Sequence, residues 1–272
     1  MSALYEANLS TRTSSLYERY SRNRCIRGNK ANIMIIHHQN YTIKSTLSHD
    51  ETIMLFEDIV HKSYTSLGEF QNNSHCFVEK IDIKGYQPIV FKIPRYRNKR
   101  RWERFLSLFR SGEAFRNHNS MMYLPTIHLK APKPLFAAEK RANGMVVESF
   151  FTYFFIEGKI ASAENIPAVL EALSLLHQQG LTRSDPKLEN FLISENEVFF
   201  IDFRLKKPFL FSKTQCIFNL CKFFQTLPQE QRNLYIKPYQ SPWFNFIYGI
   251  NDMMIATRKM KKTLKKKLSK SH

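Results

Sequence analysis

The feature that most constrains the fold of this chain is the order of patterns between residues 166 and 203. Apolar residues recur at helical spacing over 166–177, which predicts an amphipathic helix that ends at Gly180. A polar loop follows, and residues 191–193 and 198–201 then have the composition of two short strands. This order predicts a polar loop held between a packed helix and a β-hairpin.

Three polar residues stand at defined points of this stretch. Asp185 lies in the loop, Asn190 follows five residues later, and Asp202 ends the second strand. Phosphoryl transfer needs a carboxylate that accepts the proton of the attacking hydroxyl, together with ligands that hold Mg²⁺ against the nucleotide phosphates. Because Mg²⁺ prefers oxygen ligands, Asp185, Asn190 and Asp202 can together supply the base and the metal ligands. The alternative interpretation is a surface loop with acids placed by chance.

The first half of the chain favours strands, and the second half favours helices. Residues 33–85 are strand-like over most of their length, and a Gly-containing turn joins 75–83 to 88–93 as a hairpin. Residues 97–117 have apolar residues at near-helical spacing, with an interruption near Gly112. Further elements are predicted from the same patterns: strands at 135–138 and 145–156, and mostly helices over 207–256.

The stretch around Asp185 resembles the catalytic loop and metal-binding aspartate of protein-kinase-like enzymes, in which H-x-D-x-x-x-x-N precedes D-F-G. The resemblance implies that Asp185 is the base and that Asn190 and Asp202 are the metal ligands. It also implies that Lys187 steadies the transferring phosphate and that ATP and Mg²⁺ are the cofactors. It also implies that Lys92, in a strand, anchors the nucleotide phosphates and that an acid on the next helix pairs with it. Glu113 is the predicted partner, and Glu103, in a dense basic run, is its competitor.

Several departures from the protein-kinase pattern narrow this interpretation. The chain has no G-x-G-x-x-G, so residues 68–74 are the predicted phosphate-covering turn. Arg183 replaces the histidine of the catalytic loop, Arg204 follows Asp202-Phe203 in place of glycine, and no A-P-E segment occurs. These differences argue against a regulated protein kinase and favour a compact kinase for a small substrate or a glycan.

Four segments carry a narrower resemblance: 88–93, 104–113, 155–158 and 175–186. Through them the chain, from about Phe77 to the C-terminus, resembles the lipopolysaccharide core heptose kinases. The resemblance implies ATP-dependent phosphorylation of a heptose hydroxyl in the inner core, at the cytoplasmic face of the inner membrane. The lipopolysaccharide core oligosaccharide is then the expected partner.

The predicted fold class is therefore α+β, a two-lobed protein-kinase-like fold with a small β-rich N-lobe and a mainly helical C-lobe. The expected divisions are a basic polar leader at 1–33, the N-lobe at 34–157, the C-lobe at 158–257 and a basic amphipathic tail at 258–272.

The charge is strongly positive, with 41 Lys and Arg against 23 Asp and Glu and a net charge of +18. Such a charge predicts an anionic partner without choosing among them. In the tail, Met260, Leu264 and Leu268 are four residues apart among many cations, which favours an interfacial helix on an anionic membrane surface. A frayed solvated tail and RNA contact are the alternatives. A second basic run, at 92–104, could face the membrane, the saccharide or solvent.

Other classes of protein are weaker alternatives. The four cysteines form no C-x-x-C pair, so neither a zinc site nor a disulfide framework is predicted. No secretory signal and no membrane-spanning apolar run is evident, so a cytoplasmic protein is expected. The resemblance to the heptose kinases implies that it is peripheral at the inner membrane. Nucleic acid is not an expected partner, because no RRM, KH or helix-turn-helix signature is present. A kinase for a Kdo sugar or a protein, and an inactive kinase fold that acts as a membrane adaptor, remain open.

Overall fold

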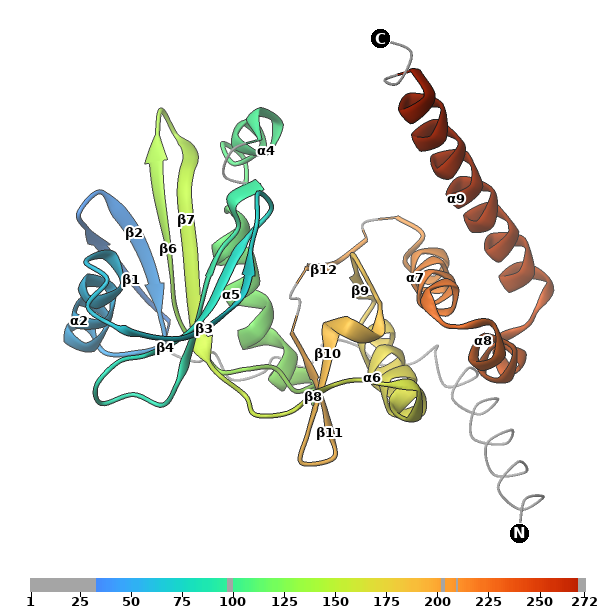
Figure 1. Cartoon of the computed structure of the whole chain (residues 1–272), viewed down its shortest axis with the longest axis horizontal. Coiled ribbons are helices and arrows are strands. Elements are labelled where there is room, and N and C mark those ends of the chain that lie inside the picture. Colours follow the sequence, from blue (N-terminus) through green and yellow to red (C-terminus); the bar gives the residue numbers. More distant parts are fainter. Residues whose placement is uncertain (1–32, 97–99, 202–203, 209, 269–272) are drawn as a thin grey trace. The chain divides into compact units, whose positions relative to one another are not determined.

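A computed structural model describes residues 33–96, 100–201, 204–208 and 210–268 (Figure 1). These residues form two compact units. The sheet unit comprises residues 33–160 and 191–205, and the helical unit comprises residues 161–190 and 206–268. The predicted fold class is confirmed: the chain is α+β, β-rich toward its N-terminus and mainly helical toward its C-terminus.

The sheet unit is built on one seven-stranded antiparallel sheet with the strand order β1-β2-β6-β7-β5-β4-β3. The predicted hairpin of β4 and β5 is confirmed, with Lys92 opposite Val78. The strand bounds are β1 Met34–His38, β2 Tyr41–Ser45, β3 Thr65–Asn72, β4 Phe77–Asp82, β5 Ile89–Ile93, β6 Pro134–Ala142 and β7 Met145–Phe154.

One face of this sheet carries an aromatic core covered by α2 (His49–Val60). Phe56 of α2 stacks on Phe150 of β7, with ring centroids 5.9 Å apart. The expectation that residues 33–85 are strand-like is wrong at α2. Ser48 and Glu51 cap its N-terminus reciprocally, and Thr52, Leu55, Phe56 and Ile59 are buried at helical spacing.

The other face is covered by α5 (Glu113–Tyr123), which packs on β6 and β7. Ala138 belongs to the α2 side, whereas its neighbour Glu139 accepts a 3.4 Å hydrogen bond from the backbone N–H of Phe115 in α5. Neighbouring side chains of a strand point to opposite faces, so α2 and α5 lie on opposite sides of the sheet. The short helix α4 (Arg101–Leu106) precedes α5, and the predicted interruption near Gly112 is confirmed.

The predicted phosphate-covering turn is displaced from its expected position. Gly68 lies inside β3 at a bulge with φ +145°, and the β3–β4 turn lies at 73–76 instead of 68–74. Asn73 closes this turn, because its side-chain oxygen accepts hydrogen bonds from the backbone N–H groups of His75 (2.8 Å) and Cys76 (3.0 Å).

A short hairpin also belongs to the sheet unit. β10 (Phe191–Ser194) pairs with β11 (Glu197–Phe200) on one side and with β8 (Lys159–Ile160) on the other. Glu195 and Asn196 join the hairpin with φ values of +51° and +62°, as a two-residue turn requires. The predicted pair of strands is therefore confirmed.

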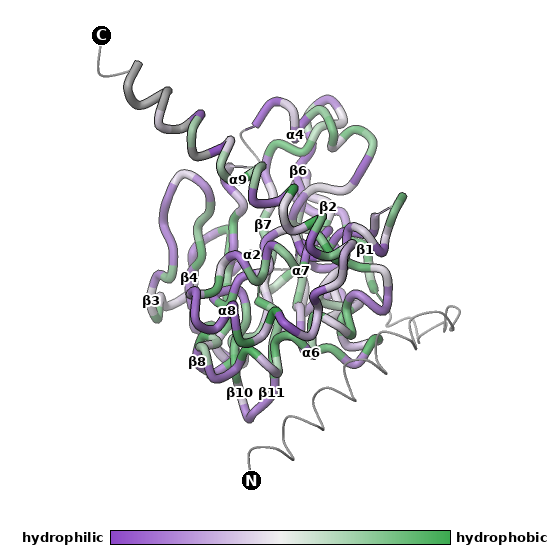
Figure 2. Tube along the Cα trace, turned by 90° about the vertical axis from the view of Figure 1, so that its right-hand side faces the viewer, coloured by the Kyte–Doolittle hydropathy of each residue, from purple (hydrophilic) through white to green (hydrophobic). Residues whose placement is uncertain are grey.

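The first α-helix of the helical unit is α6 (Ile166–Gln178), whose apolar stripe is buried as its spacing predicts. Among the described residues no helix is long and apolar enough to cross a membrane. Figure 2 shows the hydropathy of the residues along the trace of the chain. The elements of the unit are η3 Ala163–Asn165, α6 Ile166–Gln178, β9 Thr182–Arg183, η4 Leu188–Asn190, α7 Ser212–Thr226, α8 Gln229–Ile236, η5 Lys237–Tyr239 and α9 Pro242–Leu268, while β12 spans Leu205–Lys206 at the boundary between the units.

Candidate active site

The loop that contains Asp185 starts at a tightly closed helix end. The backbone N–H of Gly180 donates to the carbonyl of His177 (2.8 Å), and that of Leu181 donates to Leu176 (3.2 Å). This pair of bonds is a Schellman motif, which needs a left-handed residue, and Gly180 supplies it with φ +67°. The helix end therefore fixes the direction in which the loop leaves.

The loop itself is closed by Asn190. The side-chain Nδ2 of Asn190 donates a 2.7 Å hydrogen bond to the backbone carbonyl of Asp185, and the backbone N–H of Asn190 donates to Lys187 (3.0 Å). The five-residue spacing found in the sequence thus places the two predicted site residues side by side. Because Nδ2 is the donor in this bond, the amide oxygen of Asn190 is not used in it.

Lys187 lies next to Asp185, as predicted. Its Nζ is 3.7 Å from Oδ2 of Asp185, and the two side chains are 40% and 43% exposed. At this exposure the ion pair contributes little to stability. Both groups can instead reach a bound substrate. The structure therefore brings Asp185, Lys187 and Asn190 together in one accessible loop.

Asn219 and Arg183 form a buried polar clamp that fixes the backbone of the loop. Asn219 of α7 donates to the carbonyl of Arg183 (2.6 Å) and accepts from its backbone N–H (3.2 Å). The side-chain oxygen of Asn219 also lies 3.0 Å from Nε2 of the buried His177. Arg183 in turn donates from Nη1 to the carbonyl of Asn190 (3.2 Å), so the residue that replaces the expected histidine closes the loop.

Asn219 and His177 were not predicted as parts of the site. Asn219 is 36 residues from Arg183 and 42 from His177 in the sequence. The available signal is weak: one polar residue at a core position of an otherwise apolar helical stripe. Burial lowers the pKa of His177 to about 4, so its ring is neutral at neutral pH and can donate its one N–H, at Nε2, to the side-chain oxygen of Asn219.

A group of cations lies near Asp185 within the helical unit. Lys222 follows Asn219 by three residues on α7 and so lies on the same face of that helix, which contacts the loop. Burial lowers the pKa of Lys222, the positive charges of Lys206 and Arg258 lower it further, and Asp185 acts in the opposite direction. Lys222, Lys206 and Arg258 are hereafter the cation cluster. Like charges placed together favour an anionic ligand.

The predicted metal ligand Asp202 lies outside the described residues. Within the described ranges no group of three or more His, Cys, Asp or Glu could hold a metal ion. The donor atoms that the loop does present, the amide oxygen of Asn190 and the carboxylate of Asp185, are of the type that Mg²⁺ prefers. The donor atoms of the described residues thus fit a magnesium ion in their chemistry.

The predicted nucleotide anchor, Lys92, lies in the sheet unit on β5. Its cross-strand neighbour on β7 is Phe151, and its Nζ lies 6.0 Å from the centroid of that ring. In the same cross-strand row Phe151 pairs with Ala137, and Ala137 with Lys44. Since paired residues share a face, Lys92 lies on the α5 side of the sheet, where an acid of α5 could approach it.

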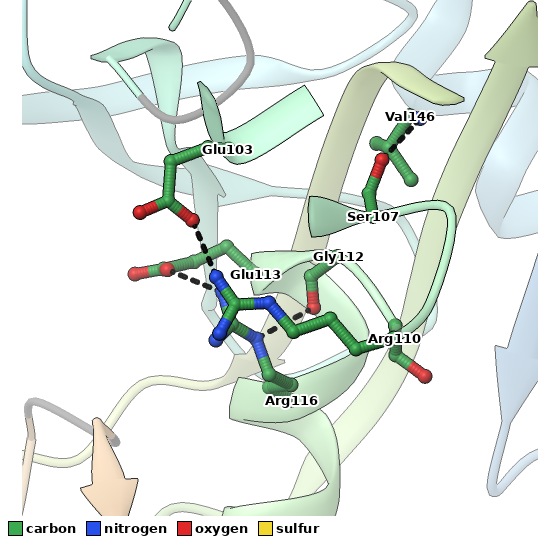
Figure 3. A pocket seen from close by; sticks show the side chains of 8 residues that line it. Glu103, Ser107, Arg110, Gly112, Glu113, Arg116 and Val146 are labelled. Atoms are coloured by element: carbon green, nitrogen blue, oxygen red, sulfur yellow. Dashed lines mark hydrogen bonds and ion pairs between the residues drawn. The ribbon is translucent and has the colours of Figure 1, made fainter. Parts of the chain in front are cut away.

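Glu113, the predicted partner of Lys92, is the first residue of α5 and has Arg116 as an ion-pair partner at 3.2 Å. Its competitor Glu103 pairs with Arg110 at 2.8 Å. Both pairs line a small pocket between α4 and α5 (Figure 3). The pairing of Lys92 with Glu113 stays a prediction.

A buried carboxylate that sequence reasoning missed lies at the start of α5. Glu139 of β6 is 1% exposed, and its Oε1 accepts from the backbone N–H of Phe115. Gly112 permits this approach, because a Cβ atom there would be 2.6 Å from Oε1 of Glu139. Burial raises the pKa of Glu139, against the opposing effect of Arg141. Glu139 thus caps α5, which no side chain at Gly112 can do.

Comparisons with known proteins identify related sequences and structures. The profile of the lipopolysaccharide core biosynthesis protein (WaaY) family matches residues 32–267. Among solved structures, WaaP in complex with acyl carrier protein is 12% identical, with a TM-score of 0.46, covering 76% of this chain and 91% of that one. An apo thermostable mutant of the aminoglycoside phosphotransferase APH(4)-Ia is 10% identical, with a TM-score of 0.48, covering 71% and 87%. No curated protein matches the chain.

Proposed function

Because the chain belongs to the lipopolysaccharide core biosynthesis protein (WaaY) family, we propose that it is an ATP-dependent kinase of the lipopolysaccharide core. The family resemblance predicted from the sequence is thereby confirmed. The proposed acceptor is a heptose hydroxyl of the inner core. The observation that carries the proposal is the loop in which Asn190 closes on the backbone of Asp185 and Lys187 lies 3.7 Å from the Asp185 carboxylate.

The proposed reaction assigns one role to each side chain of this loop. Asp185 accepts the proton of the acceptor hydroxyl while that oxygen forms a bond to the γ-phosphorus of ATP and the bond to ADP breaks. Lys187 offsets the negative charge on the transferring phosphoryl group. The clamp of Asn219 and Arg183 keeps the loop backbone in place, so that Asp185 does not have to be ordered during the reaction.

Two further parts of the proposal concern the nucleotide. Asn190 and Asp202 would hold Mg²⁺, which would neutralise phosphate charge as it develops. Lys92, paired with Glu113, would bind the nucleotide phosphates. Lys92 can be tested alone, because its replacement by Met should raise the KM for ATP and leave the KM for the acceptor unchanged.

The cation cluster supports an anionic acceptor. Carboxylates and phosphates form strong charge-assisted hydrogen bonds with Lys and Arg, so the cluster would bind an acceptor that has such groups. The basic tail that follows Arg258 is proposed to keep the enzyme at the anionic inner-membrane surface. Its helix α9 continues to Leu268.

Mass spectrometry of purified core oligosaccharide incubated with ATP and the enzyme tests this function. The proposal predicts one added phosphate, located on a heptose by fragmentation. Phosphate on a Kdo residue would replace the proposed acceptor, and transfer to no core component, with nucleotide still bound, would favour the inactive-adaptor alternative.

A further inference from the structure

An aromatic group on α4 and the turn after it is exposed to solvent. Trp102 stacks on Phe105 with ring centroids 5.6 Å apart, and Phe105 contacts Phe109 edge-to-face at 5.7 Å. The three side chains are 58%, 46% and 78% exposed, and Leu108 beside them is 43% exposed. A contiguous apolar patch of this kind on a soluble domain marks an interaction site.

The backbone that carries the patch is anchored to strands β6 and β7 of the sheet. Ser107 is buried, its hydroxyl oxygen accepts a 2.8 Å hydrogen bond from the backbone N–H of Val146 (Figure 3), and its carbonyl accepts one from Arg141 (2.9 Å). Leu108 reaches the β6–β7 turn, where a Cβ on Gly144 would lie 3.0 Å from its Cδ2. The exposure of the aromatic rings is thus a consequence of an anchored backbone and not of a frayed helix end.

The border of the patch is cationic. Arg100 and Arg101 are exposed at the start of α4, and the guanidinium of Arg100 lies 5.7 Å from the centroid of the Tyr96 ring. Glu103, the acidic residue within α4, is paired with Arg110 at 2.8 Å. The α4 surface, which we define as Trp102, Phe105, Leu108 and Phe109 with Arg100 and Arg101, therefore combines exposed aromatic rings with positive charge.

We propose that the α4 surface docks on an anionic lipid bilayer, with its aromatic rings at the level of the headgroups and its arginines on lipid phosphates. Trp and Tyr favour this depth because one end of each ring system is apolar and the other polar. The charge of the border selects an anionic lipid over an apolar protein groove. The inference rests on the proposed function in one respect: an acceptor anchored in a membrane gives the enzyme a reason to bind there.

The chain offers a built-in reporter and a matched control. It contains two tryptophans, and Trp243 on α9 is similarly exposed at 52% and similarly stacked, on Phe246 at 5.5 Å. Replacing Trp243 by Phe leaves Trp102 as the sole indole. Replacing Trp243 and Phe246 by Ser removes an equal kind of exposed aromatic pair from a different surface.

Vesicle sedimentation and tryptophan fluorescence together test the proposal. The full-length W243F protein should bind vesicles of phosphatidylglycerol mixed with phosphatidylcholine, and its emission should shift to the blue. Replacing Trp102, Phe105 and Phe109 by Ser should weaken binding by about tenfold or more, because each buried aromatic ring contributes strongly to partitioning. Replacing Trp243 and Phe246 by Ser should leave binding within about twofold of the wild type.

The variant with Ser at positions 102, 105 and 109 is hereafter the α4 variant. Three results would overturn the inference. They are an unchanged emission of Trp102 on anionic vesicles, equal vesicle binding by the α4 variant and the wild type, and wild-type binding to pure phosphatidylcholine vesicles that equals its binding to anionic vesicles. Loss of all binding on deleting residues 259–272, with the α4 variant unaffected, would assign the membrane contact to the tail instead. Activity on delipidated core oligosaccharide separates this inference from the proposed function, because the α4 variant should keep that activity.

Discussion

At the scale of single residues, three side chains of the proposed site were predictable because the chemistry and the spacing are local. Asp185, Lys187 and Asn190 lie within six residues, and the structure joins them by short contacts. The buried side chains that fix the loop and the start of α5 were not predictable. Asn219 and Glu139 are buried polar groups whose partners are distant in the sequence, and one sequence contains no signal for such pairings.

His177 makes the stability of the chain depend on pH. Burial lowers its pKa from 6.5 to about 4, and burial lowers the pKa of His118 to about 4 as well. Above about pH 6.5 both histidines are neutral in the folded and unfolded chain, so their contribution is fully present there. As the pH falls from about 6.5 toward 4, the unfolded chain binds protons first and the free energy of unfolding should fall by about 1–3 kcal/mol for each.

Urea unfolding at several pH values measures this effect. Replacing His177 or His118 by Gln should each flatten the dependence between about pH 6.5 and pH 4, whereas replacing the exposed His49 by Gln serves as the control. An unchanged slope in both buried variants would show that neither ring is held neutral by the fold.

At the scale of elements, local signals predicted α6, the β4–β5 and β10–β11 hairpins and the break before α5. The helix α2 was missed because its capping residues, Ser48 and Glu51, lie within a strand-rich region that dominated the interpretation. The order of the sheet was also outside the reach of the sequence. β2 pairs with β6, and Ile43 lies opposite Ala138 far along the chain, so this neighbourhood depends on tertiary packing.

Two glycines of the helical unit should respond oppositely to alanine. Gly180 ends α6 with φ +67° and has open space around it, so a Cβ there costs only backbone strain. Gly180→Ala should lower the free energy of unfolding by about 1 kcal/mol. Gly249 lies inside α9 with open space around it, and Gly249→Ala should raise it by about 0.5–1 kcal/mol.

Chemical denaturation of the two variants beside the wild type gives both values. Stabilisation by Gly180→Ala would contradict the closed helix end from which the catalytic loop departs.

At the scale of the whole molecule, the net charge of +18 indicates a basic protein but does not locate the cations near the proposed site. The two units that the structure separates also group the β10–β11 hairpin with the sheet, which local patterns cannot reveal. The predicted division into lobes and tail stays a prediction. The cation cluster places three of these positive charges near Asp185 of the proposed site.

Salt should weaken the binding of an anionic acceptor to the cation cluster. Raising the ionic strength from about 0.05 to about 0.3 M should raise the KM for the core oligosaccharide severalfold, with a small effect on kcat. Salt screens the attraction between the cations and the acceptor, whereas the phosphoryl-transfer step depends on it less. Lys222→Ala should raise the same KM by about tenfold and reduce its salt dependence.

The matched control for Lys222 is Lys84→Ala, which removes the same charge from an exposed turn of the sheet unit. A Lys222→Ala effect on the KM for ATP alone, with the acceptor KM unchanged, would assign the cation cluster to the nucleotide.

The central claim is that the carboxylate of Asp185 serves as the base of a phosphoryl transfer. The most direct measurement is the rate of phosphate transfer from ATP to purified core oligosaccharide by Asp185→Asn, beside Glu189→Gln, which changes an exposed acid of the same loop. The account predicts that Asp185→Asn is slower than the wild type by about 10²–10⁴-fold while Glu189→Gln stays near the wild-type rate, with both variants folded. An Asp185→Asn enzyme that transfers phosphate at the wild-type rate would contradict it.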